Sequence, residues 1–345
     1  MSAGAHVGPF VRRRPTSAFW GAGALALWLC MPAQVVWAAG DPADSAAILF
    51  KVQAASRQLD YSGVLAYQQG TTMQSARLIH IVDGTGERER LEILDGAPRE
   101  YQREDDSLQR LLIPDQKTII IEPGRVDRFP GLLLGNAKNV GKHYQVKQLK
   151  VSSRIAGHVC TEFEVLPRDA YRYGYKLCVE PGTNLLLKTQ TIDKRGGIVD
   201  QVAFSTLKLR DQVQVSQVVS PWDTKDWKVI KSQSKPVDVA KLGWRIFLPP
   251  GFESMTQVER PLKSGKAVKQ LVYSDGLAAV SVFIETDVAG QGGHTPHKGA
   301  ARTGAMNIYG APVGDYWVTA IGEVPGNALS ELVKRTEYVP LAATQ

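Results

Sequence analysis

The chain has 345 residues, of which 41 are Lys or Arg and 34 are Asp or Glu, so its formal net charge is +7. Apart from Arg12 to Arg14 near the start, the basic residues are spread along the chain. This pattern argues against a nucleic-acid-binding protein, which needs basic side chains gathered on one face.

Residues 1–38 have the layout of a secretory signal peptide. Arg12 to Arg14 form a positive n-region, an apolar run from Ala18 to Leu29 follows, and Val36-Trp37-Ala38 is a small-residue cleavage pattern. The alternative is an uncleaved membrane anchor, but a spanning helix needs about 20 apolar residues, and Pro32 interrupts this run. We expect cleavage near Ala38, export from the cytoplasm and a mature net charge of +4, because three of the 41 basic residues leave.

The mature chain should begin with a helix. Asp41 is a typical N-cap, and Pro42 suits the first helical position. Apolar residues then recur at helical spacing and give one apolar face, formed by Ile48, Leu49, Val52, Ala55 and Leu59. We expect this helix to cover a sheet, and a mature length of about 305 residues predicts two domains.

The next segments predict short strands separated by turns such as Asp83-Gly84-Thr85-Gly86 and Asp95-Gly96. Most connections are too short for crossover helices, so the sheet should be antiparallel. We expect a meander of about ten strands that curls around the helix. The predicted strands are 63–69, 76–82, 87–94, 117–122, 144–151, 185–192 and 198–209, with two more in the hairpin described below.

An apolar loop interrupts this series of strands between Phe129 and Gly135. A curved sheet under a helix has a concave apolar face, and such concave sites often hold ligands. Phe129, Leu132, Leu133 and Leu134 are therefore candidates to line or gate that opening. The alternative, that these side chains simply fill the core, stays open at this point.

Cys30 lies in the predicted signal peptide, and the other two of the three cysteines flank a predicted hairpin. If Arg168-Asp169-Ala170 is its loop, Cys160 lies opposite Cys178 and Glu162 lies opposite Lys176. Directly opposed strand residues have Cβ atoms about 4.5–5.5 Å apart, which is close to the spacing that a disulfide requires. We expect a structural disulfide, with two buried free thiols as the alternative, because the pair lacks the C-x-x-C spacing of a redox motif.

Residues 216–242 predict a linker, with mixed charges and no clear period, and residues 243–340 a smaller second domain. The turn Ser274-Asp275-Gly276 separates two of its predicted strands. Its expected elements are strands at Lys269–Ser274, Leu277–Glu285 and Val313–Ile321, and a helix from Pro325 whose apolar face is Leu329, Leu332 and Val333.

No catalytic or metal-binding motif stands out. The sequence contains no H-E-x-x-H, G-x-S-x-G or P-loop pattern. His294 and His297 form H-x-x-H, but they lie in a glycine-rich loop without a nearby carboxylate or cysteine, whereas a structural metal site needs about four ligands. We therefore expect a binding protein without cofactor or metal, and not an enzyme.

Several stretches together resemble the RseB/MucB family, from about Asp41 to Tyr338. In the first region these are RIAGHVCTEFEVLPRDAYRYGYKL, GTNLLLKTQTID and GGIVDQVAF. In the second they are LPPGFE, YSDGLAAVSVFIE and GAMNIYGAPVGDYWVTAIGEVP. The resemblance implies an α+β, mostly β fold. Residues 39–215 would be an antiparallel half-barrel with a covering helix, similar to LolA-type lipoprotein carriers, and residues 243–340 a smaller α+β domain.

The resemblance also implies a function. Such a protein would bind the periplasmic region of an RseA/MucA-type anti-sigma factor, shield it from site-1 proteolysis and so repress the sigma-E envelope stress response. It would release its partner on binding lipid, lipopolysaccharide or mislocalised lipoprotein, through the residue 129–134 candidates. Tyr273, Asp275 and Trp317 are the partner-binding candidates, and the alternative is that they are ordinary turn and core residues of the small domain. The alternative is a periplasmic lipid or lipoprotein carrier, which would have no need of residues 243–340.

Overall fold

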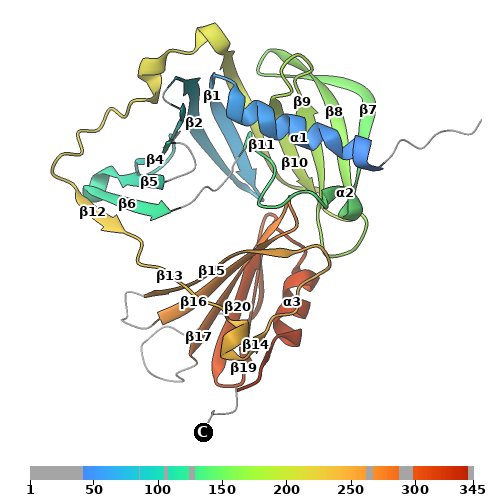
Figure 1. Ribbon diagram of the computed structural model, residues 1–345. Coiled ribbons are helices and arrows are strands. Elements are labelled where there is room, and N and C mark those ends of the chain that lie inside the picture. The colour runs from blue at the N-terminus through green and yellow to red at the C-terminus, as the bar shows by residue number, and fades with distance from the viewer. Residues whose placement is uncertain are drawn as a thin grey trace, which may run out of the picture. The chain divides into compact units, whose positions relative to one another are not determined.

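The computed structural model describes residues 42–84, 86–104, 108–123, 129–261, 267–286 and 298–340 (Figure 1). Contacts group Gly40–Gln345 into one compact unit, to which all the elements below belong. The predicted signal peptide, the N-cap residue Asp41 and the pair His294 and His297 lie outside the described residues.

A twelve-stranded sheet forms the first part of this unit, in the order β12-β6-β5-β4-β3-β2-β1-β11-β10-β9-β8-β7. Every neighbouring pair is antiparallel except β12 and β6, which are parallel. Its strands are β1 (Tyr61–Gln69), β2 (Thr72–Asp83), β3 (Gly86–Ile93), β4 (Arg99–Glu104), β5 (Leu108–Ile113), β6 (Thr118–Pro123), β7 (Tyr144–Ile155), β8 (His158–Pro167), β9 (Gly174–Val179), β10 (Leu186–Ile192), β11 (Ile198–Leu209) and β12 (Lys228–Lys231).

The expectation of a single meander was wrong. The chain makes one meander from β1 to β6 and a second from β7 to β11, and β1 pairs with β11 to join them. The connection from β6 to β7, which includes the short helix α2 (Val140–His143), carries the chain to the opposite edge of the sheet. The strands β4 and β5 were not predicted. In β4 the charged residues Glu100 and Arg103 occupy positions that are buried in the sheet, where apolar residues are expected.

The sheet is open and curves around the helix α1 (Pro42–Gln58), as Figure 1 shows. Register shifts between Val64 and Leu65 and between Gln148 and Ser152 are the kind of irregularity that bends a sheet. Leu49 and Val52 are fully buried in a core with side chains of β7 to β10. Burial of each such side chain stabilises the fold by about 1.5–3 kcal/mol. The contacts of Leu49 and Val52 confirm the prediction that this helix covers the sheet.

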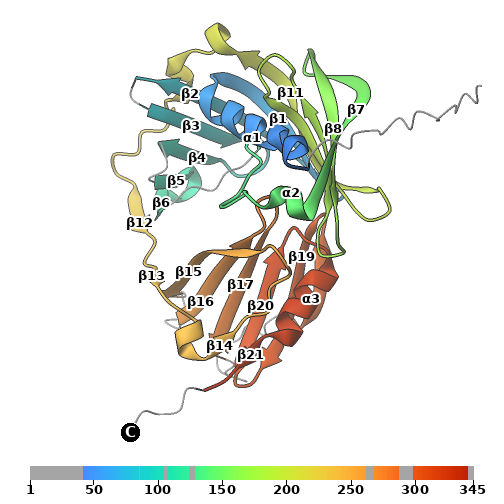
Figure 2. The same ribbon diagram turned by 45° about the vertical axis from the view of Figure 1, so that its right-hand side comes forward.

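A seven-stranded antiparallel sheet forms the second part, in the order β13-β15-β16-β17-β20-β19-β18. The helix α3 (Gly326–Arg335) packs on β19 and β20 (Figure 2) and buries Leu329, Leu332 and Val333 as expected. The strands are β13 (Lys235–Pro236), β15 (Glu253–Pro261), β16 (Ala267–Ser274), β17 (Ala279–Thr286), β18 (Gly299–Thr303), β19 (Met306–Val313) and β20 (Tyr316–Gly322), and β14 (Trp244–Arg245) pairs separately with β21 (Glu337–Tyr338).

Two details of this second part differ from expectation. The predicted strand Val313–Ile321 is divided between β19 and β20, because Gly314 adopts a positive φ of 59° and turns the chain. The range expected to be a linker contributes β12 to the edge of the first sheet and β13 to the edge of the second. None of the helices in the described ranges is long and apolar enough to span a membrane.

The disulfide between Cys160 and Cys178 is present, but the predicted strand register was wrong by two residues. Cys178 lies opposite Glu162, so Cys160 is its diagonal neighbour, with the two Cα atoms 5.3 Å apart. This separation lies within the range of disulfides. The register differs because β8 and β9 are joined by six residues, 168–173, and not by a three-residue loop.

Candidate functional site

The loop that the sequence analysis singled out lies between α1 and the first sheet. The ring of Phe129 packs against that of Phe204, with 5.3 Å between their centroids. The Oε1 atom of Gln53 in α1 accepts hydrogen bonds from the backbone N–H groups of Leu132 and Leu133, at 2.9 and 2.8 Å. Leu133 is buried in the core, whereas Phe129, Leu132 and Leu134 are half-buried. The core-filling alternative therefore holds for Leu133.

The same loop contacts a turn of the second sheet. The N–H of Leu134 donates a hydrogen bond to the carbonyl oxygen of Gly276, at 2.9 Å. Leu277, which follows, is buried in the same core as Leu133. Gly276 has a φ of 100°, and a Cβ at this position would lie 2.9 Å from the Cα of Ala137. Only glycine fits this close approach, so the loop and the turn Ser274–Gly276 form a tight junction.

The carboxylate of Asp275 lies at the centre of this junction and is 2% exposed. Its Oδ1 accepts hydrogen bonds from the N–H groups of Leu277 and Ala278, at 2.9 and 2.8 Å, which shape the turn. Its Oδ2 accepts hydrogen bonds from the hydroxyl of Tyr144, at 2.8 Å, and from Nε of Arg172, at 2.6 Å. One carboxylate from the second sheet thus receives donors from two elements of the first part.

Arg172 is the counter-ion, and its side chain is fully buried. Besides Asp275, its guanidinium donates to the carboxylate of Asp169 and to the carbonyl oxygen of Pro250. It also lies over the ring of Phe252, 5.1 Å from the centroid. A buried ion pair is favourable only when further hydrogen bonds satisfy its charged groups, and this pair meets that condition.

Two tyrosines border the ion pair. Burial raises the pKa of Tyr144 well above its usual value, and the nearby Tyr175 and the Asp275 carboxylate raise it further. Burial likewise raises the pKa of Tyr175, and the charge of Asp275 adds to the effect. Both phenols therefore stay neutral at physiological pH, and the Tyr144 hydroxyl serves as a hydrogen-bond donor.

A second contact joins the two parts at β11 and β18–β19. The carboxylate of Asp200 accepts hydrogen bonds from the N–H of Gly70, at 3.1 Å, and from the N–H of Ala305, at 2.9 Å. Asn307 donates a hydrogen bond to the hydroxyl of Tyr173, at 2.9 Å. Burial raises the pKa of Asp200, against the effect of the two backbone donors. Together with the junction, these bonds hold the first sheet to the second at two places.

The three partner-binding candidates are all buried. Tyr273 is 3% exposed and belongs to the core of the second sheet, where burial raises its pKa to about 12. Trp317 is 8% exposed, and Asp275 is part of the junction described above. In this conformation none of them offers an accessible surface, so their direct contact with a partner stays a prediction.

An apolar row crosses five neighbouring strands of the first sheet. Its residues lie opposite one another, one on each strand from β2 to β6. Leu78, at the start of the row, is only 2% exposed, and the other four are half-buried. Phe129 packs against the cluster at the start of the row. The row consists of Leu78, Leu91, Tyr101, Leu111 and Ile120. It is the surface along which an apolar ligand could extend from the loop.

Two cavities lie elsewhere. One of about 260 Å³ is lined by the alternate residues Gln102 and Leu112, on the opposite face of the same strands, and by Trp222. The other, of about 440 Å³, belongs to the second part. Neither is lined by the loop residues 129–134. Within the described ranges no three His, Cys, Asp or Glu residues are placed to hold a metal ion.

Sequence reasoning found both sides of the junction but not the residues that join them. The apolar loop and the Asp275-Gly276 turn were flagged separately, and the structure brings them together. Arg172, Tyr144 and Gln53 were missed, because no local pattern distinguishes a buried arginine or glutamine from a solvated one. One signal could have drawn attention to Arg172, namely the stretch RDAYRYGY, in which two arginines lie among three tyrosines.

These features define a class of protein with two antiparallel sheets, each with its own core, joined by a buried ion pair and an apolar loop. The comparisons then identify the family. A model described as the MucB/RseB N-terminal domain matches residues 44–222, and one described as the MucB/RseB C-terminal domain matches residues 238–337. The chain belongs to the MucB/RseB family.

Curated relatives carry the names of regulatory proteins. The chain is 25% identical over 296 residues to the sigma-E factor regulatory protein RseB of Haemophilus influenzae, a match that spans 84% of this chain and 90% of the relative. It is 29% identical over 308 residues to the sigma factor AlgU regulatory protein MucB of Pseudomonas aeruginosa, spanning 82% and 87%.

Solved structures of MucB share the fold. The complex structure of Pseudomonas aeruginosa MucA/MucB matches with a TM-score of 0.68 and 26% identity, over 87% of this chain and 100% of that chain. A crystal structure of MucB in complex with MucA(peri) matches with a TM-score of 0.66 and 25% identity, over the same shares. The likeness to MucB therefore extends over both sheets of this chain.

Proposed function

We propose that this chain is a periplasmic regulatory protein that binds the periplasmic region of a membrane anti-sigma factor. By covering that region it protects the anti-sigma factor from site-1 proteolysis and represses the sigma-E envelope stress response. The observation that carries this proposal is the match to MucB from its complex with MucA, which extends over both sheets. The protein acts by binding, and no catalytic group takes part.

The proposed location rests on two features of the sequence and structure. Residues 1–38 form the predicted signal peptide, and the mature chain contains the disulfide between Cys160 and Cys178. Disulfides persist in oxidising compartments such as the periplasm. In this proposal residues 39–215 sense the lipid, residues 216–242 act as the linker and residues 243–340 bind the anti-sigma factor.

The ligand that releases the partner is a lipid, lipopolysaccharide or mislocalised lipoprotein. Its acyl chain would lie along the row from Leu91 to Ile120 and reach Phe129 and Leu132 at the loop. Each buried methylene contributes about 0.8 kcal/mol, so a few methylenes offset the loss of one loop hydrogen bond. Because Leu134 is bonded to Gly276, a shift of the loop reaches the second sheet.

A ligand shifts a conformational equilibrium only by its different affinities for the two states. The lipid must therefore favour a state in which the junction of Arg172 and Asp275 is altered. Tyr273, Asp275 and Trp317 become candidates for direct contact with the partner only in a state that exposes them. In the described state they are buried, and the junction positions the surfaces around them.

The test uses the purified mature protein and the periplasmic domain of the anti-sigma factor from the same organism. We expect a complex in titration calorimetry and slower site-1 cleavage, and both effects should diminish when lipopolysaccharide or a lipoprotein is added. Absence of a complex, with recovery of lipoproteins from envelope extracts instead, contradicts the proposal and favours the carrier.

Two variants test whether lipid binds along the apolar row. Leu111→Glu places a charge in the apolar row and should abolish release by lipid while the complex with the anti-sigma domain still forms. Leu94→Glu, at an exposed position after β3, is the control and should behave like the native protein. Equal release in both variants would remove the apolar row from the mechanism.

A further inference from the structure

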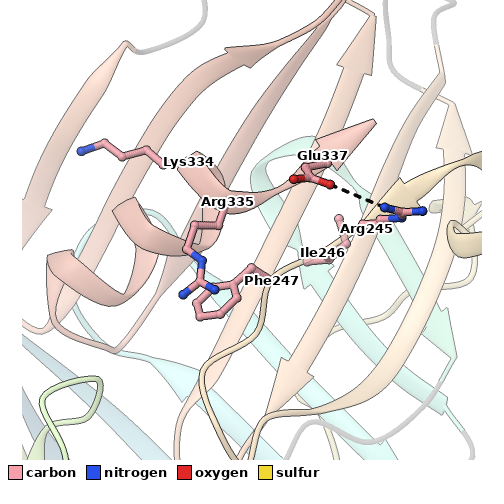
Figure 3. A pocket seen from close by; sticks show the side chains of 6 residues that line it. All are labelled: Arg245, Ile246, Phe247, Lys334, Arg335 and Glu337. Atoms are coloured by element: carbon pink, nitrogen blue, oxygen red, sulfur yellow. Dashed lines mark ion pairs between the residues drawn. The ribbon is translucent and has the colours of Figure 1, made fainter. Parts of the chain in front are cut away.

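The second part of the molecule contains an open surface cavity of about 440 Å³ to whose residues the proposed function assigns no role (Figure 3). It lies where the last turn of α3 meets β14, β21 and the extended segment that follows β14. The cavity is lined by Arg245, Ile246, Phe247, Lys334, Arg335 and Glu337.

The cavity is cationic. Three basic residues and one carboxylate line it. Figure 3 shows the Lys334 ammonium pointing away from the other lining residues, and its Nζ lies over the ring of Tyr309, 5.7 Å from the centroid. Glu337 is paired with Arg245, at 3.8 Å between exposed side chains. Among the described residues, neither Lys334 nor Arg335 has an ion-pair or hydrogen-bond partner. Cations in the last turn of a helix are expected from the helix dipole alone. The positive charge alone therefore does not identify a ligand, whereas the position of the Arg335 guanidinium is more specific.

The guanidinium of Arg335 lies over the face of an aromatic ring. Its Cζ atom lies 3.6 Å from the centroid of the Phe247 ring, and Figure 3 shows the guanidinium stacked on that ring. Stacking on an aromatic ring uses the face of a guanidinium and leaves its N–H groups free at the edge. A planar guanidinium with free N–H groups suits a carboxylate, to which it can donate two parallel hydrogen bonds.

The backbone beside this guanidinium is also unpaired. β14 pairs with β21 through Trp244 and Arg245 only, and the chain then continues in an extended form. Ile246, Phe247 and Leu248 form no backbone hydrogen bond with the residues that the structure describes. An extended segment with free N–H and C=O groups is a template for pairing with another extended chain.

We propose that this cavity binds an extended, acidic segment of a protein partner. The segment would pair with the backbone of Ile246–Leu248 and place a carboxylate on the edge of Arg335, with apolar side chains against Ile246 and Phe247. Glu337 repels a phosphate group, and Ile246 and Phe247 favour a ligand that also carries apolar side chains. The proposal concerns the chemistry of the segment, and it holds whichever protein supplies it.

The probe is an acetylated, amidated peptide of alternating Glu and Leu, six residues long, and the matched control peptide has Gln in place of Glu. Fluorescence anisotropy with the full mature protein should show binding of the acidic peptide that weakens with added salt. Hydrogen exchange should slow at residues 246–248 when the peptide binds. The control peptide should bind about ten-fold more weakly or less.

Three variants assign the site. Arg335→Gln should weaken binding of the acidic peptide about ten-fold or more, which is the value of a charge-assisted contact. Arg335→Lys should restore only part of it, because an ammonium cannot bind a carboxylate bidentately. Lys225→Gln, at an exposed position in the 216–242 range, should have no effect.

The proposal fails if Arg335→Gln leaves the peptide affinity unchanged, or if exchange at residues 246–248 is not slowed. It also fails if the peptide does not bind while vesicles containing phosphatidylglycerol bind in an Arg335-dependent way, because the site would then serve a lipid headgroup. Arg335 is exposed, so Arg335→Gln should fold normally, and circular dichroism verifies this.

Discussion

The buried pair of Arg172 and Asp275 allows a sharp test of how the two sheets are joined. Asp275→Ala removes the carboxylate and leaves the Arg172 side chain, which is fully buried, without that counter-ion. Loss of one partner of a buried ion pair costs about 3–5 kcal/mol. The nearby Asp169 carboxylate, which is partly exposed, offsets some of this cost, so we expect a loss near the lower end, about 3 kcal/mol.

Most of this cost should come from the buried charge of Arg172, which is left without its counter-ion, and less from the loss of the attraction between the two charges. Arg172→Met with Asp275→Ala removes both charges, so the double variant should be less destabilised than the sum of the two single variants. For groups in direct contact the coupling free energy is about 0.5–3 kcal/mol, and we expect the upper half of that range here.

Urea unfolding followed by tryptophan fluorescence measures the free energy of unfolding of the native protein, the two single variants and the double variant. The signal is available because Trp244 and Trp317 are buried in the second part. The matched control is the exposed pair Lys241 and Asp238, 3.5 Å apart, whose side chains are 83% and 51% exposed. Its coupling should be below about 0.5 kcal/mol. Additive effects at Arg172 and Asp275, within the same margin, would refute the reasoning.

Three further predictions concern the first sheet. Intact mass should rise by two hydrogens on reduction of the unfolded protein, and Cys160→Ser with Cys178→Ser should lower the free energy of unfolding by about 3 kcal/mol; an unchanged mass would reject the bridge. Gln53→Ala should cost about 1–2 kcal/mol, because two partly buried N–H groups lose their acceptor, whereas Gln53→Glu keeps an acceptor and should cost less; equal stability of Gln53→Ala and the native protein would contradict this. The pKa of Tyr175 is raised on folding, so the unfolded state loses its proton first, and stability should fall as the pH rises above about 10; Tyr175→Phe should reduce that fall, and an identical pH profile would be evidence against it.

Local patterns determined much of the fold. The 3.6-residue spacing of Leu49 and Val52 after Pro42 placed α1 and its buried face, because side-chain direction in a helix depends only on local geometry. Alternating strands with short turns predicted antiparallel pairing, since such turns cannot carry a crossover connection. The same reasoning placed the disulfide, although the six residues between β8 and β9 shifted the register by two.

The tertiary structure decided what these segments contact. The pairing of β1 with β11, the position of β12 beside β6 and the contact of Leu134 with Gly276 all join residues far apart in the chain. No local preference specifies such contacts, because they depend on which surfaces remain unburied after each element has formed. For the same reason the sequence placed Asp275 in a turn and among the partner-binding candidates, and it did not single out Arg172. Only the assembled fold makes the two a buried pair.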